Sequence, residues 1–183
     1  MASTLKIDTV TTTDGTGNIT FNRPINAAQG GVGGVLQVLQ TTKTDTATST
    51  NTSYTDISGL SQAITPSATN SKVLVIVNVN MSQATANSSI RWQIVRDSTA
   101  IAIGEADGSR TRATSNCNNG VGDESNSMTM MWLDSPSSTS ALTYKVQWIV
   151  GNGTAQLNKT DDDSDAAAYA RMASNIIVQE IGA

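Results

Sequence analysis

The stretch KVLVIVNVNM, residues 72–81, decides the fold of this chain. Every second residue from position 73 onward is Val or Met, and this two-residue period predicts a β-strand with one buried face. The intervening positions begin apolar at Leu74 and Ile76 and become polar at Asn78 and Asn80. We therefore expect the second face of this strand to be covered at one end and wet at the other.

Similar alternation recurs along most of the chain. It is clearest in residues 35–41, 90–95, 142–150 and 176–181, with turn-forming residues between these runs. About eight short strands at this spacing are typical of an antiparallel β-sandwich or jelly roll rather than of a parallel α/β sheet. The Ala-rich run 165–172 is too short for a stable helix, so we expect a surface loop there. The predicted fold class is all-β.

The first 33 residues form a separate predicted domain, a short extended N-terminal arm. Its short hairpin cannot bury enough surface to be stable alone, so we expect it to lie against another protein. The apolar side chains predicted to make that docking contact are Leu5, Ile7, Ile19 and Phe21. Glycines in residues 26–34 make a flexible joint, and residues 34–183 are the predicted sandwich head.

The composition excludes several classes of function. The chain of 183 residues has no histidine, 14% charged residues and a net charge of −4. An acidic chain without a basic face is not expected to bind nucleic acid. Without histidine, the usual zinc sites and the Ser-His-Asp or Cys-His pairs cannot form. Cys117 has neither a second cysteine for a disulfide nor a histidine to activate it. We therefore predict no enzyme, no catalytic residue and no cofactor.

The sequence also predicts no secretory signal and no membrane-spanning segment. No basic segment followed by an apolar stretch is visible near the start, so no secretory signal is predicted. The longest apolar run, residues 73–77, is far too short to cross a bilayer, which predicts no membrane insertion.

The best candidate for a cation site is the acidic run Asp161, Asp162, Asp163 and Asp165. Hard cations such as Ca²⁺ bind several oxygen ligands, which these carboxylates could supply. The run lacks the glycine and the terminal glutamate of an EF-hand loop, so that motif does not match. A solvated acidic loop with Arg171 as an ion-pair partner is the favoured interpretation.

Aromatic residues offer a second kind of candidate site. Trp92, Trp132 and Trp148 all fall in the apolar phase of their predicted strands. We expect core packing for all three, in preference to a platform on which sugar rings stack. Carboxylates such as Asp123 and Glu124 could serve glycoside cleavage only at a suitable separation, which the sequence does not supply.

Short motifs along the chain resemble a known family. Residues 2–10 and 14–21 are similar to the opening of virion structural and fibre proteins of marine tailed phages. Seven further motifs resemble a β-rich domain of phage fibres and head appendages: residues 41–45, 64–67, 108–112, 133–136, 143–146, 162–165 and 177–181. The resemblance implies a virion protein, a homotrimer with a jelly-roll head that contacts other capsid or tail proteins. It implies no catalytic residues.

Two functions of different classes follow from these observations. The first is a non-enzymatic surface appendage of the virion, made in the host cytoplasm and docked by residues 1–33. Because the chain has no long shaft, a short head fibre or capsid decoration is favoured over a tail-fibre tip. The alternative is a carbohydrate-binding module that recognises a host surface glycan. Its candidate recognition loops contain Asn116, Asn118, Asp123 and Tyr169.

Overall fold

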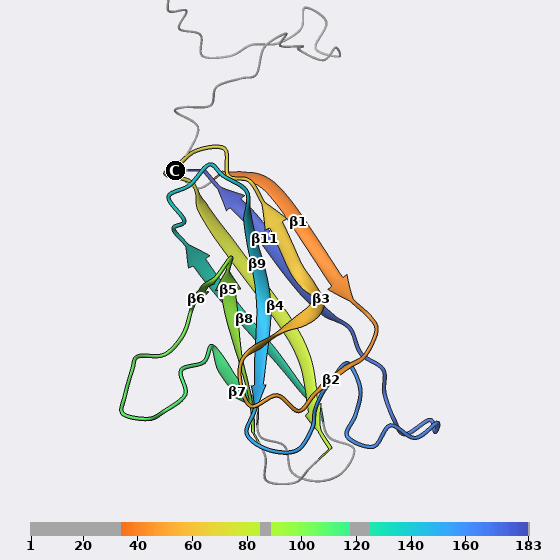
Figure 1. The fold of residues 1–183 in the computed structure, drawn as a ribbon. Coiled ribbons are helices and arrows are strands. Elements are labelled where there is room, and N and C mark those ends of the chain that lie inside the picture. Colours follow the sequence, from red (N-terminus) through yellow and green to blue (C-terminus); the bar gives the residue numbers. More distant parts are fainter. Residues whose placement is uncertain (1–33, 85–88, 118–124, 183) are drawn as a thin grey trace, which may run out of the picture. The chain divides into compact units, whose positions relative to one another are not determined.

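The chain divides into two units, Met1–Val32 and Gly33–Ala183. The computed structural model describes residues 34–84, 89–117 and 125–182 of the second unit, drawn as a coloured ribbon in Figure 1. The predicted arm lies outside the described residues and stays a prediction. Within the described residues, no helix has the length and apolar character needed to span a membrane.

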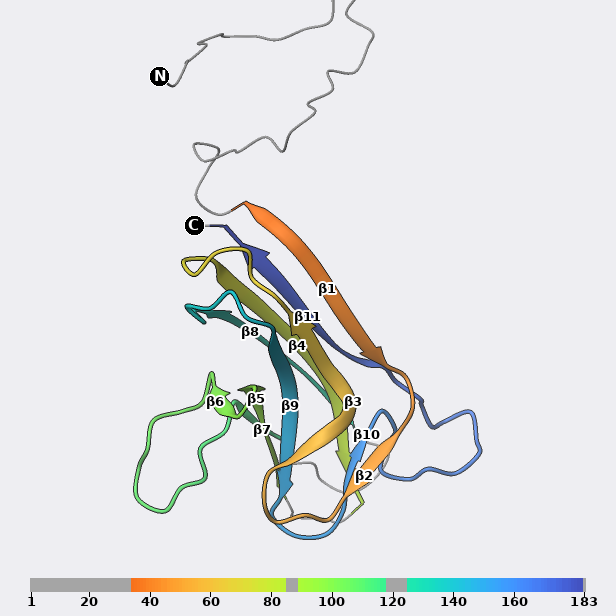
Figure 2. The ribbon, with the colours of Figure 1, turned by 45° about the horizontal axis from the view of Figure 1, so that its top comes forward.

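The described strands form two antiparallel sheets that lie face to face (Figures 1 and 2). The first sheet contains β1 (Val35–Lys43), β2 (Ala47–Ser49), β4 (Lys72–Gln83), β8 (Asn126–Asp134), β10 (Ala155–Leu157) and β11 (Ser174–Ile181). β11 and β8 flank β4 on its two sides, and β1 pairs with the other side of β11. The short strands β10 and β2 continue the sheet from the last residues of β4.

The second sheet is built around β9. It contains β3 (Thr55–Ile64), β5 (Ile90–Arg96), β6 (Thr99–Ile101), β7 (Ser115–Cys117) and β9 (Leu142–Val150). β3 and β5 flank β9, and the short strands β6 and β7 both pair with β5.

The longer strands alternate between the two sheets in chain order. β1, β4, β8 and β11 belong to the first sheet, while β3, β5 and β9 belong to the second. Neighbouring strands within a sheet are therefore mostly distant in the sequence, as in β1 beside β11. This strand order is that of a jelly roll, in which two sheets close over one core. The predicted all-β sandwich is confirmed.

The hydrophobic core lies between the sheets and is centred on β4. The inward residues of β4, from Val73 to Met81, have no solvent exposure. They face large buried side chains of the second sheet: Leu60, Trp92, Ile94, Tyr144, Val146 and Trp148. On the outward face, Leu74, Ile76 and Asn78 are half-buried, whereas Asn80 and Ser82 are buried. The expectation that this face is covered at its apolar end and wet at its polar end is therefore wrong. The strand predicted from residues 72–81 is confirmed, together with the direction of its buried face.

The sandwich has two different ends. At one end, called the terminus end, the described chain begins and finishes, and the Gly182 amide donates to the Gly34 carbonyl at 2.8 Å. At the opposite end, called the loop end, β4 finishes at Gln83 and β5 begins at Ile90. β7 and β9 also finish at this loop end, and the β9–β10 and β10–β11 connections start from it (Figure 1).

The prediction for the tryptophans is correct for two and wrong for the third. Trp92 and Trp148 are buried in the core, whereas Trp132 retains 42% of its exposure. Trp132 lies opposite Val75 on β8, so its phase is inward as expected. β8 is an edge strand, however, and the facing sheet covers its side chain only in part.

We expect Ile94→Ala to lower the free energy of unfolding by about 2–5 kcal/mol, because it opens a cavity in a closely packed core. Ile94 is fully buried on β5 between the two sheets. The matched control is Thr143→Ala on the neighbouring β9, where the side chain is exposed and the expected change is within about 0.5 kcal/mol. Urea unfolding of both variants measures the difference, and equal losses would contradict the assigned core.

Candidate functional site

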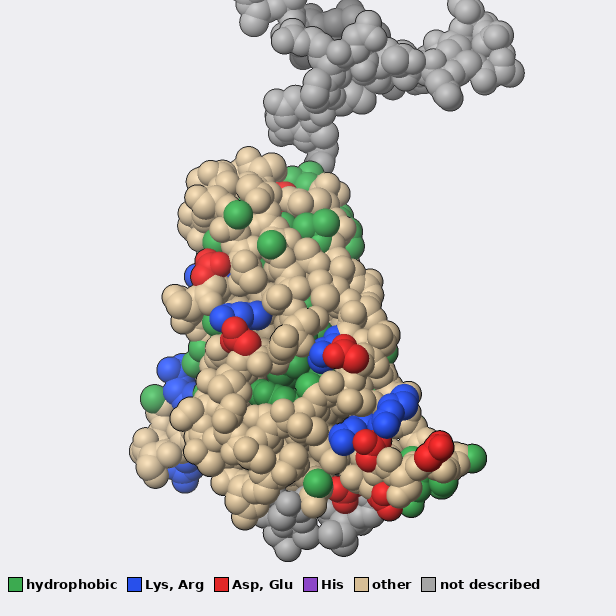
Figure 3. Space-filling view, turned by 45° about the vertical axis from the view of Figure 1, so that its right-hand side comes forward, with side chains coloured by type: hydrophobic (Ala, Val, Ile, Leu, Met, Phe, Trp, Pro, Cys, Tyr) green, Lys and Arg blue, Asp and Glu red, His purple; other side chains and the backbone are tan. Residues whose placement is uncertain are grey.

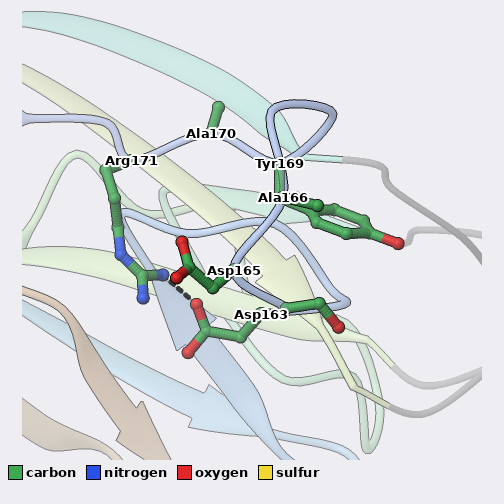
Figure 4. Close-up of a pocket in the computed structure, with 7 residues that line it drawn as sticks. Asp163, Asp165, Ala166, Tyr169, Ala170 and Arg171 are labelled. Atoms are coloured by element: carbon green, nitrogen blue, oxygen red, sulfur yellow. Dashed lines mark hydrogen bonds and ion pairs between the residues drawn. The ribbon is translucent and has the colours of Figure 1, made fainter.

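The loop between β10 and β11 forms a hollow on the surface near the loop end. Its walls are Asp163, Ser164, Asp165, Ala166, Tyr169, Ala170 and Arg171, which enclose about 230 Å³. Figure 4 shows Arg171 reaching across toward Asp163, with the Tyr169 ring on the opposite side of the loop. The hollow is open and polar, so it could admit only a small polar group.

One carboxylate of this loop, Asp163, is paired with basic side chains. Asp163 forms ion pairs with Arg171 and, at 3.0 Å, with Lys159. Hydrogen bonding from Arg171 is the main reason that the pKa of Asp163 lies below its ordinary value. The sequence-based interpretation of an acidic loop paired with Arg171 is confirmed.

Asp162 has a different set of partners, all within the loop. Its Oδ1 accepts from the Ser164 hydroxyl at 2.6 Å, and its Oδ2 accepts from the Tyr169 hydroxyl at 3.1 Å. The Ser164 bond is the main cause that lowers the pKa of Asp162. Among residues 34–84, 89–117 and 125–182, no three acidic or cysteine side chains are grouped as metal ligands. Cation binding by this loop stays a prediction.

Several charges elsewhere on the described surface also occur as pairs. Lys43 contacts Asp45 at 2.7 Å, and Lys145 contacts Asp56 at 2.8 Å. In Figure 3, blue and red side chains lie next to each other over an otherwise neutral surface. This face carries no broad charged patch that would attract a polyelectrolyte.

The two predicted recognition residues that the structure describes, Asn116 and Tyr169, lie apart. Asn116 is an exposed residue of β7 in the second sheet, and Tyr169 belongs to the loop that leads into the first sheet. β9 and β3 lie between these segments in Figures 1 and 2. Asn118 and Asp123 lie outside the described residues, as do the four predicted docking residues Leu5, Ile7, Ile19 and Phe21.

The base of the acidic loop is rigid, a feature that sequence analysis missed. Asn158 is fully buried with φ of 60°, and its side-chain amide donates to the carbonyls of Lys43 and Asp45 at 2.8 and 3.0 Å. The Ser174 hydroxyl donates to Asn158 Oδ1 at 2.6 Å. These bonds fix both ends of the loop against the connection that follows β1.

A buried carboxylate at the terminus end was also missed. Glu180 on β11 is 1% exposed. It accepts from Gln37 Nε2 at 2.7 Å and from the amide and hydroxyl of Ser67 at 2.7 and 2.6 Å. The Glu180 side chain therefore ties β1 and the β3–β4 connection to the last strand. In the sequence, Glu180 follows Val178 by two residues, so the alternation of this strand already predicted that both side chains point inward.

The hydrogen bonds decide the charge state of Glu180. Burial by itself disfavours the charged carboxylate and would raise the pKa, but the bonds from Ser67 and Gln37 outweigh it. The net effect is a pKa below the ordinary value. Glu180 is therefore an anion held by neutral donors.

A third buried polar cluster joins the two sheets near the terminus end. Asp134, the last residue of β8, accepts from Arg96 Nη1 at 2.6 Å and from the Tyr144 hydroxyl at 2.7 Å. Burial, followed by the adjacent Asp134 carboxylate, raises the pKa of Tyr144. The Tyr144 hydroxyl thus stays protonated and acts as a donor.

The single thiol has a structural environment. Cys117 is buried at the end of β7, and the Asn126 side chain donates to its sulfur at 3.3 Å. Burial raises the pKa of the thiol, which keeps it in the protonated, weakly nucleophilic form.

Comparisons with known proteins give only a distant structural similarity. No family model matches the sequence, and no curated protein matches it. The VP2 subviral particle of infectious bursal disease virus is 12% identical with a TM-score of 0.46, over 80% of this chain and 32% of that chain. The Gx strain of the same virus gives 12% identity and a TM-score of 0.43, over 79% of this chain and 40% of that chain. This chain thus spans well under half of either protein, and such values assign neither a family nor a function.

We expect Ca²⁺ at about 1 mM to raise the melting temperature of the full chain by less than about 1 °C, because Asp162 and Asp163 already have partners within the loop. Thermal unfolding with Ca²⁺ or with a chelator measures this. Arg171→Met, which removes one of the two ion-pair partners of Asp163, is the comparison variant. A rise of several degrees in the unchanged protein, reversed by the chelator, would instead establish a cation site.

We expect Glu180→Gln to lower the free energy of unfolding at neutral pH by about 1–3 kcal/mol, because a charged acceptor of three hydrogen bonds is lost. The pKa of Glu180 is lower in the folded than in the unfolded chain. Its contribution is therefore complete above the unfolded pKa and is lost as the pH falls through the folded pKa.

Urea unfolding of Glu180→Gln at neutral and at acidic pH tests this sign. The difference from the unchanged protein should shrink in acid. Glu105→Gln is the matched control, because Glu105 is exposed in a loop. A difference that grows on acidification would contradict the assigned role of Glu180.

Proposed function

We propose that this chain is a non-enzymatic structural protein of a virus particle, namely a short surface appendage of a tailed phage. Residues 1–33 would dock on other capsid or tail proteins, and residues 34–183 would form the displayed head. The motifs similar to phage fibre and head-appendage proteins support this proposal. The jelly-roll strand order is compatible with it, since such sandwiches occur in viral capsid and lectin domains.

The polarity of the sandwich is the observation that carries the proposal. Gly34 and Gly182 lie together at the terminus end, joined by a hydrogen bond of 2.8 Å. β4, β7 and β9 finish at the opposite, loop end. A head attached through residues that precede Gly34 can therefore present its loops away from the attachment point. Binding functions are concentrated in loops held by a rigid scaffold, which suits a protein displayed on a surface.

The buried clusters support a head that is stable without its arm. Glu180, Asp134 and Asn158 all take their described partners from residues 37–174. The core residues likewise belong to the two sheets. Identical subunits favour closed symmetry, and a homotrimer is the proposed assembly. A head fibre or capsid decoration is proposed before a tail-fibre tip.

A carbohydrate-binding module of a tail fibre is the second candidate. The hollow beside Tyr169 favours it, because carboxylates, a guanidinium and an aromatic ring line one small polar space. Polar groups with a nearby ring are a common way to bind a small polar ligand. A glycan array probed with the full chain, with and without Ca²⁺, tests this function, and an array without hits would exclude it.

We expect the full chain to be present in purified phage particles in a fixed copy number that is a multiple of three. A variant that lacks residues 1–33 should keep a melting temperature within about 5 °C of the full chain, because the described core lies outside the arm. The variant should nevertheless fail to join particles that lack the protein. Quantitative mass spectrometry of the particles and a binding assay measure these outcomes.

Three results would contradict the proposal. The first is absence of the chain from purified particles. The second is particle binding that survives removal of residues 1–33. The third is unfolding of the shortened chain, which would show that the arm belongs to the head.

A further inference from the structure

The outward face of the first sheet is apolar over one half of its area. In an antiparallel sheet, alternate residues point to opposite faces, so the residues between the buried ones point away from the core. On this half they are almost all hydrophobic. We call the following set the apolar outer face: Val35, Leu36, Val38, Leu74, Ile76, Met131, Leu133, Ile177 and Ile181.

The strand register makes this set continuous. Ile177 of β11 pairs with Ile76 of β4, which pairs on its other side with Met131 of β8. In the next row toward the terminus end, Leu74 pairs with Leu133. Directly paired side chains on one face of a sheet touch each other. The rows therefore join into one surface across three strands.

The β1 residues extend this surface to the other edge of the sheet. Val38 pairs with Gln179, and Val35 pairs with Ile181 at the terminus end. A register shift follows Val35, and both Val35 and Leu36 are consequently exposed. The apolar outer face thus has members on all four strands from β8 to β1, with the polar Gln179 of β11 between Val38 and Leu74.

Several hydrophobic side chains of this face are largely exposed. Met131, Leu133, Val35, Leu36 and Val38 are each between 55% and 60% exposed. Such a group of exposed side chains is on the order of a few hundred Å², the size at which the largest apolar patch of a protein is often functional. One partner's share of a standard interface is about 800 Å², so an interface here would extend beyond these five residues to the half-buried ones beside them.

The charge pattern limits what can cover this surface. Lys72 is the one charged residue among the outward-facing positions described for β1, β4, β8 and β11. It lies at the margin, where its ammonium donates to the Ser135 hydroxyl at 2.9 Å. The other half of the face is neutral and polar, with Asn78 donating to Thr129 at 2.9 Å. Copies of this face can pack around the axis of a closed oligomer without bringing like charges together.

The edge of the sheet beside this surface is also open. β8 pairs with β4 on one side and has no other strand partner among the described residues. It is nine residues long and carries Met131, Trp132 and Leu133 in succession. Soluble proteins protect long hydrophobic edge strands with charges, bulges or a cover. β8 has neither a lysine nor a proline, so a cover is the remaining protection.

We infer that the apolar outer face binds a second copy of this chain. The interface would bury Met131 and Leu133 of β8 together with the central residues Leu74, Ile76 and Ile177. A nearly uncharged surface can be covered by another copy of this chain without unpaired charges. A charged partner would find no opposite charges there. The inference rests on the self-association included in the proposed function and names the surface responsible for it. The polar half of the same sheet face would stay in water.

Native mass in solution tests this interface. The full chain at about 10 µM should have a native mass of two or more 19.1 kDa subunits. Met131→Glu combined with Leu133→Glu should raise the dissociation constant at least about 100-fold, because two carboxylates would be buried without partners. The expected product is a monomer. The matched control is Ser127→Glu combined with Thr129→Glu, on the same strand and face but in the polar half, which should keep the oligomer.

A second pair of variants keeps the test decisive if the first variant does not fold. Leu36→Glu with Val38→Glu changes the β1 side of the surface, and Gln40→Glu with Thr42→Glu is its control on the same face. Each variant must have the circular dichroism spectrum of the unchanged protein and must unfold as cooperatively. A monomeric unchanged chain would overturn the inference, as would an oligomer that survives both apolar-face variants.

The result is separate from the test of the virion role. If the chain is an oligomer held by this face but is absent from particles, the interface stands and the proposed function fails. If the chain is present in particles while the apolar-face variants keep the native mass, the proposed function stands and the interface fails.

Discussion

The packing of one strand against the opposite sheet is the interaction on which the structure depends. The inward side chains of β4 have no exposure, and β11 and β8 use its two edges for their own hydrogen bonds. β1 in turn needs β11 as its partner. Loss of the inward row of β4 would therefore remove the support of the entire first sheet. Burial of that row is the main driving force available to a chain with so few charges.

Buried polar groups then define how the ends of the sandwich are closed. Glu180 connects the first and last strands at the terminus end, Asp134 connects the two sheets, and Asn158 holds the base of the acidic loop. Each of these groups is costly to bury unless its partners are in place. They therefore favour a single arrangement of connections around a core whose apolar contacts are less directional.

The sequence allowed some features to be predicted and not others, for reasons that particular residues illustrate. The strand at residues 72–81 and its buried face were predictable because a two-residue period is a local property. The ion pair of Arg171 with Asp163 was predictable because both residues belong to one short loop. The exposure of Trp132 was not predictable. Its place in the alternation points it toward the core, and only the position of β8 at the edge of the sheet leaves it uncovered. Predictions about Asn118, Asp123 and the arm lie beyond the described residues.

By itself, the sequence determined the all-β class, the phase of the longer strands and the lack of histidine chemistry, since alternation and composition need no long-range information. Only the tertiary structure decided which strands become neighbours. That choice brings Ile177, Ile76 and Met131 into one outward row, although more than forty positions separate each from the next. It also places Gln37 and Ser67 around Glu180. Contacts between distant residues depend on how two sheets close over a shared core, and no local pattern encodes that closure.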